Sequence, residues 1–189
     1  MLGSHNSLSY LPIQGWRKVL KPWVKCQSLT LKEQYEKGVR YFDLRVRQDK
    51  YGLWWYCHNN ATFALVFEHE EIIDFLADKQ VKVRVILDVR KKPEKNAEEY
   101  KSDFLTLITV FFRNNLKIDS AIVYWEWHEC LIRTIKQHEY HASVSAPWYK
   151  YILGTKWFAK HYNKKYLEEN KDILDSEDEV ILLDYMQFK

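Results

Sequence analysis

GVRYFDLRVR, residues 38–47, is the stretch that decides the fold class of this chain. Apolar side chains recur at every second position from Phe42 to Val46, and the charged Asp43 and Arg45 fall between them. A period of two predicts a β-strand with one apolar and one charged face.

The rest of the chain alternates between strand-like and helix-like segments. We expect strands at residues 2–4, 39–47, 53–59, 81–90, 120–128, 140–146 and 179–186, and helices at residues 30–37, 64–79, 96–115 and 157–170. Thr30 and Glu33 form a predicted capping box for the first helix, and Gly38 is its predicted end. Strands separated by helices require right-handed crossovers and a mostly parallel sheet.

Two topologies fit this alternation: an open doubly wound sheet and a barrel. In a barrel, polar side chains of the inner face gather at the carboxyl ends of the strands, where barrel active sites lie. The polar residues that fall late in the expected strands are His5, Asp43, Arg45, His58, Asp88, Arg90, Glu126, His128 and Asp184. In an open sheet, helices cover both faces, and these charges would find fewer hydrogen-bond and ion-pair partners. We therefore predict one α/β domain over residues 1–189, a compact TIM-type (β/α) barrel that is incomplete or distorted because only seven strands are recognisable.

The composition excludes several classes of protein. Apolar residues make up 47% of the chain, enough for a sizeable core, and a net charge of +3 with interspersed signs gives no footprint for nucleic acid. The cysteines, Cys26, Cys57 and Cys130, lack CxxC spacing, which argues against a disulfide scaffold and a structural zinc site. No run reaches the roughly 18 apolar residues of a membrane-spanning helix. No secretory signal precedes the first strand, so we expect a cytoplasmic protein if Met1 is the native start and a secreted one if a leader has been removed.

Two histidines, an arginine and two carboxylates at one barrel mouth would suit the cleavage of a phosphodiester. One histidine can take a proton from a nucleophilic hydroxyl, and the other can give a proton to the leaving oxygen. An arginine can bind phosphoryl oxygens through two hydrogen bonds and stabilise the charge of the transition state. A carboxylate behind a histidine fixes its tautomer and favours its charged form.

Four motifs resemble one known family. GSHNS at residues 3–7, GVRYFDLRVR at 38–47, a strand ending in His58 and VILLDYM at 180–186 are similar to the catalytic domain of phosphatidylinositol-specific phospholipase C, most of all to the compact bacterial type. The resemblance is continuous through the first half of the chain and returns at the last strand. It implies a distorted TIM-type barrel that cleaves a phosphatidylinositol-like phospholipid, or a related polyol phosphodiester, through a cyclic phosphate.

The resemblance also implies a role for each matching residue. His5 would be the general base that activates a hydroxyl of the headgroup, and Asp184 would pair with it. His58 would be the general acid for the leaving oxygen. Arg45 would contact the phosphate, and Asp43 would orient neighbouring groups.

Arg45 also bears on the question of a metal. Calcium-dependent relatives carry an acidic calcium ligand at this position, whereas the bacterial type has arginine, so the resemblance implies metal-independent catalysis with no cofactor and disfavours calcium. Asn6 departs from the aspartate of the bacterial type. Asn6, Arg90 and Tyr149 are assigned to substrate binding, and the positions that grip inositol in the bacterial enzymes are not matched.

The segment IQGWRKVLKPWVK, residues 13–25, follows the first strand and mixes Trp16 and Trp23 with four cationic side chains. Such a mixture suits contact with a membrane surface, although ordinary helix packing explains it equally well. Two other functions compete with the leading one. One is a metal-dependent glycerophosphodiester or sphingomyelin-type phosphodiesterase, and the other is a catalytically inactive barrel that binds lipid.

Overall fold

The computed structural model describes residues 1–89, 97–112, 116–125, 128–130, 138–141, 154–176 and 179–189. The strands are β1 (Leu2–Ser4), β2 (Tyr41–Gln48), β3 (Trp54–His58), β4 (Ala61–Leu65), β5 (Lys82–Val89), β6 (Lys117–Trp125), β7 (His128–Cys130), β8 (His138–His141) and β9 (Glu179–Leu183). The helices are α1 (Lys21–Val24), α2 (Leu31–Glu36), α3 (Glu70–Asp78), α4 (Ala97–Thr106), α6 (Thr155–Glu169) and α7 (Lys171–Leu174). Shorter or irregular helical turns are η1 (Gly15–Leu20), η2 (Val66–Glu68), the π-helical η3 (Leu107–Phe112) and η4 (Met186–Phe188). Within these ranges, no helix is long and apolar enough to cross a membrane.

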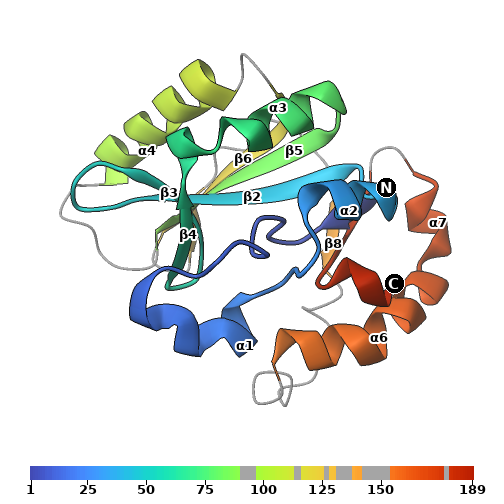
Figure 1. Cartoon of the computed structure of the whole chain (residues 1–189). Helices are drawn as coiled ribbons and strands as arrows, with labels where there is room; N and C mark the ends of the chain where they lie inside the picture. The colour runs from blue at the N-terminus through green and yellow to red at the C-terminus, as the bar shows by residue number, and fades with distance from the viewer. Residues whose placement is uncertain (90–96, 113–115, 126–127, 131–137, 142–153, 177–178) are drawn as a thin grey trace.

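The strands form one sheet in the order β7-β6-β5-β2-β1-β9-β8. From β6 to β8 along this order, every neighbouring pair is parallel. Helices α3 and α4 lie on one side of β2 and β5, and α1 and α6 lie on the opposite side of the molecule (Figure 1). Among the described strands, the path does not return on itself, so the sheet is an incomplete barrel. This confirms the predicted α/β class and the predicted incompleteness.

The two faces of β2 and β5 are as different as the alternation predicts. Phe42 and Leu44 of β2 and Val83 and Val85 of β5 are fully buried in the main hydrophobic core. Asp43 is also fully buried, but on the other face of β2. Because both faces are buried, the polar side chains of this second face must bind one another.

The close approach of β1 to its neighbours explains Gly3. β1 pairs in parallel with both β2 and β9. A Cβ atom on Gly3 would lie 2.7 Å from Cδ2 of Leu182 and 2.8 Å from Cγ1 of Val180. Glycine therefore lets β1 sit between two strands whose side chains fill this space, and so fixes where the residues after β1 lie.

Residues 53–59 correct one expectation. They were expected to form a barrel strand followed at once by a helix, but β3 is antiparallel to β2 and continues into a hairpin with β4. His58 pairs with Ala61 across the two-residue turn of Asn59 and Asn60, and Asn59 has φ 53°. Asparagine tolerates this left-handed conformation and is favoured in such hairpin turns. The helix of this region therefore begins only at Glu70, and His58 comes from a hairpin rather than from a parallel strand.

The last strand is also shorter than expected. β9 ends at Leu183, and Tyr185 takes the left-handed conformation with φ 48°, which turns the chain into η4. The capping box of Thr30 and Glu33 at the start of α2 is confirmed.

Candidate active site

The adjacency of β1 and β9 brings His5 next to Asp184. Ser4 pairs with Leu183 in the parallel ladder, and the His5 N–H donates to the Leu183 carbonyl at 3.0 Å. The next residue of each strand therefore leaves the sheet at the same place. His5 Nδ1 lies 2.7 Å from Asp184 Oδ1, and 179 residues separate the two in sequence.

Arg45 fixes the tautomer of His5. Its guanidinium Nη2 lies 2.7 Å from His5 Nε2. A guanidinium can only donate hydrogen bonds, so Nε2 must be the acceptor and must carry no proton. The proton of the neutral ring then sits on Nδ1 and is donated to Asp184. This is the protonation state that a general base needs, with its lone pair directed toward a cation.

Asp43 is held by two guanidinium groups. Its Oδ1 accepts from Arg84 Nε at 3.0 Å, and its Oδ2 lies 3.3 Å from Arg45 Nε and accepts from the Asn6 backbone N–H at 2.9 Å. Burial opposes the ionisation of Asp43, but Arg84 and then Arg45 outweigh it and hold the pKa of this carboxyl well below its ordinary value. Asp43 is therefore an anion that orients Arg45 toward His5.

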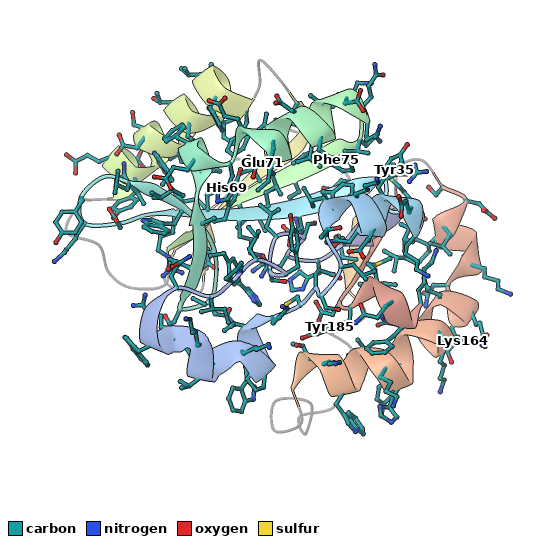
Figure 2. All side chains as sticks on the ribbon, in the orientation of Figure 1. Tyr35, His69, Glu71, Phe75, Lys164 and Tyr185 are labelled. Atoms are coloured by element: carbon teal, nitrogen blue, oxygen red, sulfur yellow. The ribbon has the colours of Figure 1, made fainter. Side chains whose placement is uncertain are left out.

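His58 faces His5 from the hairpin. Its Nδ1 donates to the Val24 carbonyl at 2.7 Å, at the end of α1. The centroids of the two imidazole rings are 5.7 Å apart, and the rings are nearly perpendicular, at 89°. With Nδ1 used as a donor, Nε2 is the ring nitrogen that gains or loses a proton. His69, by contrast, pairs with Glu71 at 2.6 Å at the start of α3 (Figure 2).

Comparison with solved structures identifies the fold in which these residues lie. No family model and no curated protein sequence matches the chain. Solved structures do match. Phosphatidylinositol-specific phospholipase C from Listeria monocytogenes superposes with a TM-score of 0.60 at 15% identity, covering 100% of this chain and 89% of that one. The enzyme from Staphylococcus aureus gives a TM-score of 0.62 at 13% identity, covering 98% of this chain and 85% of that one.

This chain has the phosphatidylinositol-specific phospholipase C fold. That fold is a TIM-type barrel, so the predicted barrel class is confirmed, in incomplete form. At 13% and 15% sequence identity, these similarities show the fold of this chain and not its activity. What this chain can do chemically depends on the residues that the fold brings together here.

Cys26 was not predicted to lie in this site. This residue is fully buried, and its Sγ lies 3.6 Å from His58 Nδ1. Ser9 Oγ accepts from the backbone N–H of Cys26 at 2.9 Å and of Gln27 at 2.8 Å, which anchors the segment after α1 against the loop after β1. Burial first, and then the nearby Asp184 carboxylate, raises the pKa of the Cys26 thiol well above its ordinary value. No local pattern marks this cysteine, because its neighbours in space come from other segments.

Gln27 and Arg84 were missed as well. The Gln27 side-chain amide donates to the backbone carbonyls of His5 at 3.1 Å and Leu183 at 2.8 Å, and its oxygen accepts from the Met186 N–H at 3.1 Å. It therefore ties the ends of β1 and β9 together. The alternation of charged residues along 81–90 could have marked Arg84 as a site residue. That pattern does not reveal, however, that Arg84 binds Asp43 on β2.

The three residues assigned to substrate binding have different outcomes. Asn6 is buried beside the cluster in a left-handed conformation, φ 45°. Its side-chain Nδ2 has no hydrogen-bond partner within the part of the chain that the structure describes. Arg90 and Tyr149 lie outside the described residues.

The segment with the two tryptophans borders the site. Trp16 on η1 is 74% exposed and Trp23 on α1 is 45% exposed, and the next residue, Val24, is the one that binds His58. A cavity of about 290 Å³ opens beside this segment. It is lined by Leu11, Pro12, Ile13, Lys18, Lys21 and Lys25. Exposed aromatic and cationic side chains therefore lie on the segment whose last helical residue, Val24, binds His58. Tyr185 lies beside α6 (Figure 2), and its backbone N–H donates to the Cys26 carbonyl.

Proposed function

We propose that this protein is a metal-independent phosphodiesterase that cleaves a phosphatidylinositol-like phospholipid, or a related polyol phosphodiester, through a cyclic phosphate. One observation carries the proposal. The His5 ring is held at Nδ1 by Asp184 and at Nε2 by Arg45, both at 2.7 Å, and the His58 ring is 5.7 Å away. A base, an acid and a phosphate-binding cation together are what phosphodiester cleavage requires.

His5 would begin the reaction as the general base. A hydroxyl of the polyol headgroup would give its proton to Nε2, and its oxygen would form the new bond to phosphorus. The Arg45 guanidinium, which here donates to Nε2, would transfer that hydrogen bond to a phosphoryl oxygen of the substrate. Asp184 would stabilise the imidazolium that forms, because the pair is close and Asp184 is buried.

His58 would complete the reaction as the general acid. The bond between phosphorus and the leaving oxygen breaks, and this oxygen takes the proton from His58 Nε2. Nδ1 stays bound to the Val24 carbonyl throughout, which keeps the ring oriented. The products would be an alcohol and a cyclic phosphate, because the attacking hydroxyl belongs to the same headgroup.

Arg45 would take the place of a metal ion. Its charge is fixed at every physiological pH, and Asp43 holds it facing His5. The Arg84 guanidinium also binds Asp43, so this carboxylate competes less strongly with a phosphoryl oxygen of the substrate for Arg45. These contacts support catalysis without a divalent cation.

The exposed side chains at the border of the site favour a lipid substrate. Trp16, Val19 and Trp23 are exposed apolar side chains on consecutive turns next to a lysine-lined cavity. Aromatic and cationic side chains together bind the headgroup region of an anionic bilayer. We propose that this segment contacts the membrane while the headgroup reaches His5.

Phosphorus NMR tests the reaction. The protein is incubated with vesicles of phosphatidylinositol, and in parallel with phosphatidylcholine, sphingomyelin and glycerophosphoinositol, with and without a chelator. We expect a cyclic phosphate from the inositol-containing substrates and equal rates with the chelator. Loss of activity in the chelator would favour the metal-dependent alternative. Vesicle binding with no product from any substrate would favour an inactive lipid-binding barrel and would contradict the proposal.

A further inference from the structure

Three side chains of different kinds that could bind a metal ion lie together in the site: His5, Cys26 and Asp184. A ring nitrogen of His5, a carboxylate oxygen of Asp184 and the Cys26 sulfur all lie within 4.8 Å of one another, and His5 Nδ1 is the ring nitrogen 2.7 Å from Asp184. They come from three separate segments: the loop after β1, the chain after β9 and the segment after α1. The proposed reaction uses two of these groups and gives no role to the thiol.

The geometry is close to that of a tetrahedral zinc site. Bonds of about 2.3 Å to sulfur and about 2.0–2.2 Å to nitrogen and oxygen place the ligand atoms of such a site about 3.2–3.6 Å apart. His5 Nδ1 and Asp184 Oδ1, now 2.7 Å apart, would have to separate slightly, and the Cys26 sulfur would have to approach by about an ångström.

The ligand types select the metal. A thiolate, an imidazole and a carboxylate suit zinc and other thiophilic divalent cations, whereas calcium and magnesium prefer oxygen alone. Three protein ligands leave a fourth position for water or a phosphoryl oxygen. The backbone on either side of the thiol is already fixed by Ser9 and Gln27, so the site needs little ordering.

We propose that His5, Cys26 and Asp184 form a binding site for zinc or a similar thiophilic cation, and that its occupation inhibits the protein. Binding would release one net proton to water, that of the Cys26 thiol, while the proton of the His5 ring would move from Nδ1 to Nε2. Affinity would therefore rise with pH. A neutral imidazole bound to metal through Nδ1 carries its proton on Nε2, so Arg45 would have to give up its hydrogen bond to that nitrogen. The nitrogen that would act as the general base then has no lone pair, so catalysis stops.

The binding part of this inference is independent of the proposed function, and only the inhibition rests on it. Cobalt(II) is the probe for binding, because a thiolate ligand gives an intense near-ultraviolet absorption band. We expect the full-length protein to develop this band with one equivalent of cobalt and to lose it when zinc is added. Cys26→Ser should lose the band, whereas Cys57→Ser and Cys130→Ser should keep it. No band in the wild-type protein, or a band that Cys26→Ser retains, would overturn the site.

A second measurement does not depend on the folding of a variant. X-ray absorption of the zinc-loaded wild-type protein should show one sulfur ligand at about 2.3 Å with nitrogen and oxygen ligands. A zinc environment without sulfur would also overturn the site. If phospholipid cleavage is observed, micromolar zinc should inhibit it, and Cys26→Ser should raise the inhibitory concentration at least about tenfold. Binding without inhibition would refute the regulatory part alone.

Discussion

Asp184→Asn isolates the charge behind His5. The substitution keeps the size of the side chain and an oxygen that can accept from His5 Nδ1, but it removes the negative charge that would stabilise the imidazolium. At the observed separation of 2.7 Å, an effective dielectric constant of about 20 gives an attraction of about 6 kcal/mol. The neutral hydrogen bond that remains, and partial exposure of the ring, offset about half of this. We expect about 3 kcal/mol of lost transition-state stabilisation, a fall in kcat on the order of a hundredfold.

The assay is the cleavage of phosphatidylinositol in vesicles, followed by phosphorus NMR, with kcat and KM measured separately. The effect should fall on kcat, because the imidazolium exists only as the reaction proceeds. Asp172→Asn, a change of the same kind at an exposed position on α7, serves as the control and should leave both constants unchanged. An Asp184→Asn variant that keeps kcat within about threefold of the wild type, with an intact far-ultraviolet spectrum, would refute the role of the pair.

Four further changes test other parts of the structure. His58→Ala should abolish cleavage while the control His69→Ala keeps it, as measured by product formation; residual wild-type turnover would remove His58 from the mechanism. Asp43→Asn should lower the free energy of unfolding in urea by about 3–5 kcal/mol at pH 7, because two buried guanidinium groups lose their anion. The pKa of Asp43 is lowered in the folded protein. Its contribution to the free energy of unfolding is therefore fully present above the unfolded pKa of about 3.9 and is lost as the pH falls further. A difference in stability between wild type and variant that does not shrink below that pH would contradict this. Gly3→Ala should cost about 1–3 kcal/mol in thermal or urea unfolding, because β1 has no room for a Cβ, and a neutral effect would show that β1 can shift. Trp16→Ala should weaken sedimentation with anionic vesicles and change stability by less than about 0.5 kcal/mol; unchanged sedimentation would argue against membrane contact there.

Sequence patterns predicted those elements whose signal is local. The alternation along residues 38–47 identified β2 and its two faces, and the capping box placed the start of α2. The prediction went wrong at residues 53–59, where an apolar run was taken for a barrel strand. Apolar runs do not reveal whether a strand joins a sheet in parallel or folds back on its neighbour. The Asn59–Asn60 pair is the turn signal that the prediction passed over.

Sequence patterns alone were enough to identify the kinds of groups available: strands with one charged face, and histidine, arginine and aspartate beside them. Which of these groups meet depends on the three-dimensional fold. His5 touches Asp184 because β1 pairs with β9, and Cys26 joins them because Ser9 and Gln27 anchor its segment there. Such contacts link positions far apart in the chain, and their free energy comes from strand pairing and burial shared by the whole fold. Local periodicity contains no information about that pairing, so it could not show that the Cys26 thiol and the Arg84 guanidinium lie in the site.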